Sequence, residues 1–127
     1  MAIFKSGNYN TFESLVKEVL PSKSDLIRYE ILPQIENTLK SMLGNLDNVR
    51  GESLDITQIC NRQGLQGFNC NIVYQVLDFK VPEAPKDAIQ EDIESISDNI
   101  SREDAHLKSV NIDTEQGLLS ITYTIPL

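Results

Sequence analysis

Residues 85–127 read PKDAIQEDIESISDNISREDAHLKSVNIDTEQGLLSITYTIPL, and no other part of the chain says as much about the fold. Within Pro85–Arg102, isoleucines recur at i, i+4, i+7 and i+11, the spacing of one apolar stripe along a helix. They are Ile89, Ile93, Ile96 and Ile100. Pro85 suits the first turn, where the N–H that proline lacks is unpaired in any helix. The pattern predicts an amphipathic helix that packs on the rest of the protein through its isoleucines.

The residues after this helix alternate as the two strands of a hairpin do. Leu107, Val110 and Ile112 outline a short strand, and Thr114–Gly117 supplies a turn with a glycine for positive φ. In Leu118–Ile125, large apolar residues alternate with residues that are mostly small and hydroxylated. We expect the apolar side of this last strand to face the isoleucine stripe and the strand to expose an edge of the sheet.

Two further helices are expected nearer the start of the chain. The first covers Asn10–Leu20, with Asn10 and Glu13 as a capping pair. The second covers Pro33–Leu43, and Gly44 is placed to end it in a left-handed conformation. Because proline disfavours helix at the preceding residue, either the helix is kinked at Pro33 or it begins there and the residues before it form a separate turn.

The middle of the chain is expected to be extended. Asn45–Gly51 has the composition of a turn, Leu54–Ile59 indicates a short strand, Gly64–Phe68 a loop, and Asn71–Val81 the longest strand. The order of elements predicts an α+β fold. We expect an antiparallel sheet with helices packed on one face, ending in a C-terminal helix followed by a β-hairpin.

Length and charge narrow the class of protein. The 127 residues suit a single domain, 1–127, in which residues 1–10 are expected to be disordered. A net charge of −8 argues against nucleic acid as a partner, because phosphate binding requires clustered Lys and Arg. No stretch has the length of a membrane span or the pattern of a leader peptide, so we expect a cytoplasmic protein with no membrane insertion.

The chain lacks the common catalytic motifs. Cys60 and Cys70 lie ten residues apart with no neighbouring histidine, which predicts two reduced, partly buried thiols rather than a metal site or a disulfide. His106 beside Asp104 lacks a placed nucleophile. We therefore expect no enzyme activity, no cofactor and no small-molecule ligand. A glycosidase with two carboxylates in a cleft remains a minor alternative.

Residues 30–127 resemble the small baseplate wedge protein of contractile phage tails, the so-called lysozyme-like family, whose counterpart in type VI secretion systems is TssE. Members carry a helix with an Ile/Leu stripe, which corresponds to Ile31–Leu43, and a later segment that Gln63–Phe68 partly matches. The defining element is Glu-Pro-Arg, then Leu, two variable residues and Val, between a helix and a hairpin. Here it reads DAHLKSV over Asp104–Val110, with acid, small residue, base, Leu and Val in register.

The resemblance implies a structural protein of a contractile injection machine. Its partners would be other baseplate wedge subunits and the sheath protein, whose docking it would initiate. Asp104 and His106 would contact the wedge, and the last strand would offer its edge to a partner strand. The residues implied in these contacts are Asp104, His106, Leu107, Val110, Ser120, Thr122 and Thr124.

Two other interpretations stay open. The hairpin can be no more than the back of a closed small sheet, as most strands are. Alternatively, the protein is a small acidic inhibitor or immunity-type binding protein of the cytoplasm, which holds a basic partner against the acidic face of the helix at 85–102. Binding of that second kind weakens at high salt, whereas pairing of backbone strands does so much less.

Overall fold

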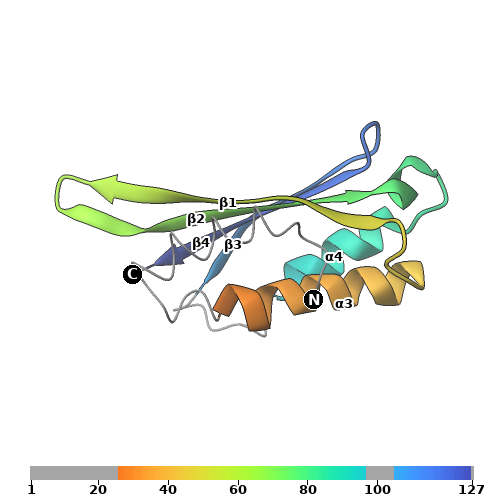
Figure 1. Ribbon diagram of the computed structural model, residues 1–127, viewed down its shortest axis with the longest axis horizontal. Helices are drawn as coiled ribbons and strands as arrows, with labels where there is room; N and C mark the ends of the chain where they lie inside the picture. Colours follow the sequence, from red (N-terminus) through yellow and green to blue (C-terminus); the bar gives the residue numbers. More distant parts are fainter. Residues whose placement is uncertain (1–25, 97–104, 127) are drawn as a thin grey trace.

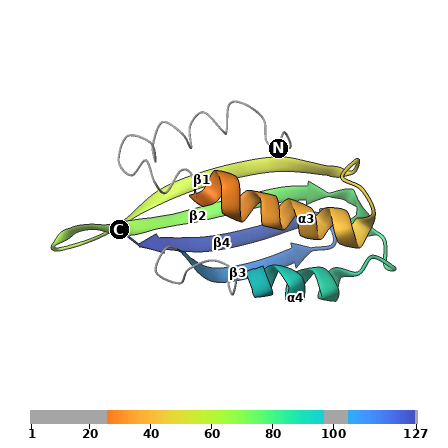
Figure 2. The ribbon, with the colours of Figure 1, turned by 90° about the horizontal axis from the view of Figure 1, so that it is seen from below.

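The computed structural model describes residues 26–96 and 105–126, which form a four-stranded antiparallel sheet with two α-helices on one of its faces (Figures 1 and 2). In chain order the elements are η1 (Ile27–Ile31, π-helical), α3 (Leu32–Leu43), β1 (Val49–Asn61), β2 (Gly64–Val76), η2 (Leu77–Lys80, a 3-10 helix), α4 (Lys86–Ile96), β3 (His106–Asp113) and β4 (Leu118–Pro126). The predicted α+β class, with an antiparallel sheet covered on one face and a hairpin after the last helix, is confirmed.

The strand order is β1-β2-β4-β3, so the last strand lies inside the sheet. β4 pairs with β2 from Gly67↔Pro126 to Gln75↔Leu118, and with β3 on its other side. The expectation that Leu118–Ile125 exposes an edge is therefore wrong. Every second residue of β4 is a large apolar side chain, and a position between two strands buries such a row most completely. Among the described residues, the outer strands are β1 and β3.

The core lies between the sheet and the helices. β2 and β4 each present alternate residues to the helices, and those of β4, Leu119, Ile121, Tyr123 and Ile125, are all buried. Ile89, Ile93 and Ile96 of α4 are buried as well, which confirms the predicted stripe as far as it is described, since Ile100 lies outside the described residues. Each such side chain contributes roughly 1.5–3 kcal/mol through removal from water.

The helix at Pro33 begins in an unusual way. The chain is already helical before the proline, but as the π-helix η1, in which Leu32 N–H donates to the Ile27 carbonyl five residues earlier. A wider turn suits the position because Pro33 has no N–H to offer to the carbonyl four residues before it. The predicted helix at Pro33–Leu43 is confirmed as α3, and Gly44 ends it at φ +89°, donating its N–H to the Lys40 carbonyl at 2.9 Å.

The region between the helices was predicted less well. Gly51 lies within β1 rather than in a turn, Gly64–Phe68 belongs to β2 rather than to a loop, and β2 ends at Val76 rather than at Val81. Gly67 explains part of the error. A Cβ there would lie 2.5 Å from the carbonyl oxygen of Ile125, so this glycine permits the close approach of β4 and does not mark a loop.

Some predictions fall on residues outside the described ranges. They concern the helix at Asn10–Leu20, the proposed disorder of residues 1–10, the end of the helix beyond Ile96, and Asp104. Among the helices of residues 26–96, none combines the length and the apolar character that crossing a bilayer requires.

Candidate interaction surface

The residues proposed for protein contacts lie on two neighbouring strands. His106, Leu107 and Val110 are on the outer strand β3, and Ser120, Thr122 and Thr124 are on β4 beside it. The sheet brings the two groups together, because His106 pairs with Thr124 and Val110 with Ile121. Asp104 lies outside the described residues, so its pairing with His106 stays a prediction.

β3 has a strand on one side only within the described part of the chain. Its side chains toward the helices, Leu107, Val110 and Ile112, pack against the core but are only half-buried. The pairing with β4 is interrupted once, between Leu107↔Tyr123 and Ser109↔Thr122. Lys108 is the extra residue of this β-bulge and is exposed. β3 therefore presents a sheet edge with an incompletely covered apolar side.

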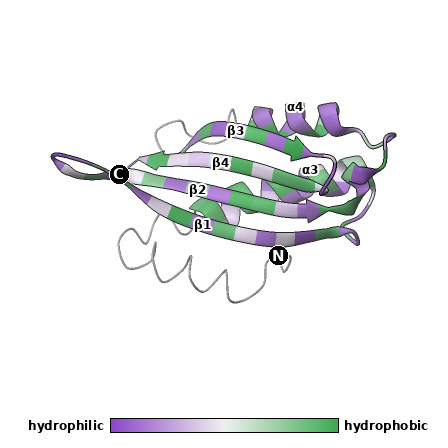
Figure 3. Cartoon of the chain, turned by 90° about the horizontal axis from the view of Figure 1, so that it is seen from above, coloured by the Kyte–Doolittle hydropathy of each residue, from purple (hydrophilic) through white to green (hydrophobic). Residues whose placement is uncertain are grey.

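We call the sheet face turned away from both helices the open face; Figure 3 looks down on it. On the central strands β2 and β4 it carries Asn69, Asn71, Val73, Gln75, Leu118, Ser120, Thr122 and Thr124. All eight are half-buried and none is charged. The sequence suggested that Ser120, Thr122 and Thr124 flank an edge of the sheet. They lie instead in the middle of this face.

Two side-chain pairs cross the open face between β2 and β4. The Thr122 hydroxyl donates to Asn71 Oδ1 at 3.0 Å, and the Thr124 hydroxyl donates to Asn69 Oδ1 at 3.1 Å. Asn69 and Asn71 were not among the predicted contact residues. The polar residue at every second position of 69–75 was the available signal, but it indicates a contact only once β4 is known to lie beside β2.

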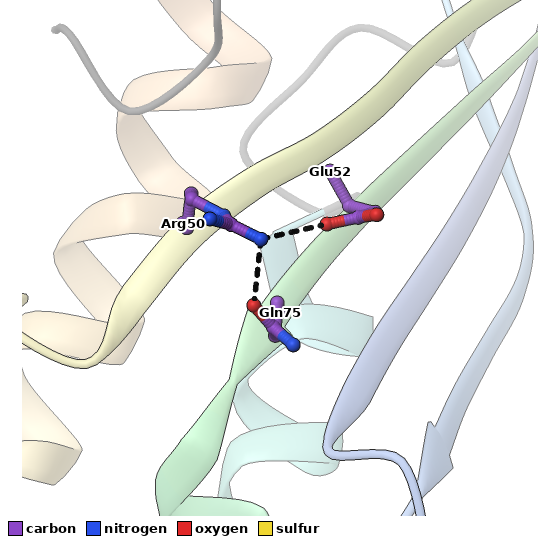
Figure 4. A network of polar contacts seen from close by, with 3 residues as sticks. All are labelled: Arg50, Glu52 and Gln75. Atoms are coloured by element: carbon purple, nitrogen blue, oxygen red, sulfur yellow. Dashed lines mark hydrogen bonds and ion pairs between the residues drawn. The ribbon is translucent and has the colours of Figure 1, made fainter.

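The other outer strand, β1, has a charged group at its own bulge. Glu52 is the extra residue between Gly51↔Tyr74 and Ser53↔Val73. Arg50 Nη2 lies 3.6 Å from Glu52 Oε2 and donates to Gln75 Oε1 at 3.0 Å (Figure 4). Since the Arg50 and Glu52 side chains are about half exposed, their ion pair contributes little to stability.

The helices carry a shallow depression on the side away from the sheet. Its volume is about 320 Å³, and its lining residues are Met42, Ala88, Glu91, Asp92 and Ser95. The Thr38 hydroxyl donates to Asp92 Oδ2 at 2.6 Å and so links α3 to α4. Of the acids on α4, Asp87, Glu91 and Glu94 are exposed.

Three buried side chains of the core have a raised pKa, and two of them, Cys70 and Tyr123, are paired across β2 and β4. Burial raises the pKa of the Glu36 carboxyl, which accepts a hydrogen bond from the Tyr74 hydroxyl at 3.2 Å. Burial also raises the pKa of Tyr123 to about 12, and its hydroxyl has no hydrogen-bond partner among the described residues. Burial raises the pKa of the Cys70 thiol too.

Both cysteines are free, as predicted, although Cys60 is exposed while Cys70 is buried. Within residues 26–96 and 105–126, no three of the His, Cys, Asp and Glu side chains gather in a way that could hold a metal ion. Two features of the described sheet that this arrangement leaves without a cover are the β3 edge and the open face of β2 and β4.

Comparisons with protein-family models, with curated proteins and with solved structures found no match.

Proposed function

We propose that the protein is a structural component of the baseplate of a contractile injection machine, and that it holds a partner subunit by strand addition at the edge of its sheet. The observation that carries the proposal is the outer side of β3, where within the described residues no strand pairs and three apolar side chains are half-buried. The resemblance of Asp104–Val110 and the flanking helix and hairpin to the baseplate wedge family supports it.

The proposed edge differs from the one expected from the sequence. β4 has partners on both sides, so its backbone groups are already paired. In an antiparallel edge strand, alternate residues direct their N–H and C=O groups away from the sheet, and an extended segment of a partner satisfies them. β3 is the strand of the C-terminal hairpin that has such groups, and it also carries His106, Leu107 and Val110.

The test is capture of partners from the native cells. Tagged protein recovered at high salt should bring down sheath and other baseplate subunits, identified by mass spectrometry. Val110→Asp should abolish the capture, because it places a charge on the apolar side of the edge. Leu77→Asp is the control: Leu77 is an exposed apolar residue (45%) of η2 and is not part of β3. Recovery of no machine subunit with the wild-type protein would refute the proposal.

A second candidate rests on the acidic side of α4. Asp87, Glu91 and Glu94 are exposed, and Glu91 and Asp92 line the depression beside Met42. A small acidic inhibitor or immunity-type protein would use these carboxylates against a basic partner. In that case the capture should yield one basic protein at low salt and lose it at high salt, since screening weakens contacts between exposed charges.

A further inference from the structure

The two outer strands differ in how much apolar surface an added strand would cover. On β1, Val49 and Leu54 are already buried, with 8% and 2% of their surface exposed, while Ile56 and Ile59 are half-buried. On β3, Leu107, Val110 and Ile112 are all half-buried. Removal of apolar area from water is the main favourable term in association. An added strand would therefore bury more apolar surface at β3 than at β1.

The helix α4 lies beside this edge. It packs against β3 through buried isoleucines, and in Figures 1 and 2 it runs on the helix side of the sheet, next to and outside β3. A strand added to β3 would therefore have α4 on its helix side and would lie beside Ser109, Asn111 and Asp113 on its open-face side. Such a strand needs apolar residues at alternate positions and small polar residues between them.

Lys108 limits which strand fits. As the extra residue of the bulge it breaks the regular register, so an uninterrupted edge extends only over Ser109–Asp113. The Lys108 side chain is exposed and makes no hydrogen bond or ion pair within the described residues. A bulge and a lysine are both devices that keep an edge strand from pairing indiscriminately. A partner that does pair has to accommodate this ammonium group.

On the basis of the proposed assembly function, we propose that β3 accepts an extended partner strand along Ser109–Asp113, and that Lys108 selects a strand with a carboxylate beside the bulge. The carboxylate would form an ion pair with the ammonium group, whereas a lysine at the same place would repel it. Lys108 is thus a specificity determinant of the docking edge. The partner's other residues would match the apolar side of β3 and the polar residues Ser109, Asn111 and Asp113 on its open-face side.

The proposal can be tested with two synthetic peptides on the intact protein. Both alternate valine and threonine over eight residues, and they differ only in a Glu or a Lys near the C-terminal end, which antiparallel pairing places beside Lys108. We expect the Glu peptide to bind about tenfold more tightly, from one exposed ion pair gained and one repulsion avoided. Bound peptide should slow amide hydrogen exchange in residues 106–113 and not in residues 49–61.

Charge reversal supplies the control. Lys108→Glu should invert the preference between the peptides, while Lys40→Glu, on an exposed position of α3, should leave it unchanged. Slowed exchange in β1 instead of β3, or equal binding of the two peptides, would overturn the proposal.

The two proposals fail in different ways. If Lys108→Glu still captures the machine subunits as the wild-type protein does, the selectivity of Lys108 is refuted and the assembly function stands. If the Glu peptide protects β3 but no machine subunit is ever captured, the edge specificity stands and the assembly function is refuted.

Discussion

The two outer strands of the sheet, β1 and β3, show how differently one fold can treat its edges. Both are paired on one side within the described residues, and both contain a bulge with a charged extra residue, Glu52 or Lys108. On β1, however, Val49 and Leu54 are buried and Ile56 and Ile59 are half-buried, whereas on β3 none of Leu107, Val110 and Ile112 is buried. An unpaired backbone alone therefore does not define a docking edge, since the apolar side chains next to it decide how much an added strand would gain.

The largest expected difference between β1 and β3 is in the stability lost when one leucine of each strand is replaced by alanine. Leu54→Ala on β1 should lower the free energy of unfolding by about 2–4 kcal/mol, because Leu54 is 2% exposed and its removal leaves a cavity. Leu107→Ala on β3 should cost only about 1 kcal/mol, because that side chain is already partly exposed to water. Urea denaturation measures both. Equal losses would contradict the contrast between the edges.

In the two hairpin turns we expect the opposite order: a substitution in the β3–β4 turn should destabilise the protein more than one in the β1–β2 turn. Gly117, before β4, has φ +69°, and a Cβ there would lie 2.9 Å from the Val76 carbonyl oxygen. Gly64, at the start of β2, has φ +113° but nothing within 4 Å of such a Cβ. Both alanine variants carry backbone strain of about 1 kcal/mol, and Gly117→Ala adds the clash, for a total of about 2–3 kcal/mol. Thermal unfolding of the two variants compares them, and a larger loss for Gly64→Ala would show that the clash is relieved.

The buried carboxyl of Glu36, on α3 beside Tyr74 of β2, should make the stability of the protein depend on pH. Because burial raises its pKa, the folded protein holds the proton more tightly than the unfolded chain does. The stability this provides is complete below the ordinary value of 4.5 and is lost as the pH rises through the raised pKa. Glu36→Gln should therefore stabilise the protein on the order of 1 kcal/mol more at pH 7 than at pH 4.

Denaturant unfolding across pH 4–8 measures this difference. The matched control is Glu30→Gln, because Glu30 is exposed in η1. A difference between Glu36→Gln and the wild type that does not change with pH would show that the carboxyl titrates alike in the folded and unfolded states.

The smallest effect is expected on the open face. Thr122→Val removes the hydroxyl that donates to Asn71 and should cost about 0.5–1 kcal/mol, since Asn71 is only half-buried. Combined with Asn71→Ala in a double-mutant cycle, it should show a coupling of similar size. Additive effects would mean that the two side chains act independently and that their hydrogen bond does not stabilise the open face.

The local elements of the C-terminal region were correctly predicted, because each depends on neighbours in the chain. The stripe at Ile89, Ile93 and Ile96 follows from the helical period, and the alternation in Leu118–Ile125 from the pleat of a strand. Gly44 and Gly117 were placed correctly at positive φ. The β1–β2 hairpin was not predicted, because glycine is typical of loops when only its neighbours in the sequence are considered. Gly51, Gly64 and Gly67 were assigned to a turn and a loop for this reason.

Long-range pairing accounts for what was wrong. Gly67 needs to be a glycine because Ile125, 58 positions later, passes against its Cα, and that distance in sequence leaves no local trace. The candidate surface also depended on long-range pairing. His106, Leu107, Val110, Ser120, Thr122 and Thr124 were named from the sequence, but their roles as edge or face depended on which strand lay beside β4.

The amino-acid sequence alone was enough to establish an α+β fold, its amphipathic helix and its last hairpin, because hydrophobic period and turn chemistry are properties of short segments. The order β1-β2-β4-β3 was settled only in three dimensions, where burial of the apolar row of β4 between two strands outweighed the simpler arrangement with that strand at the edge. Because that order makes β3 the outer strand of the last hairpin, the proposed docking edge lies on β3, next to Lys108.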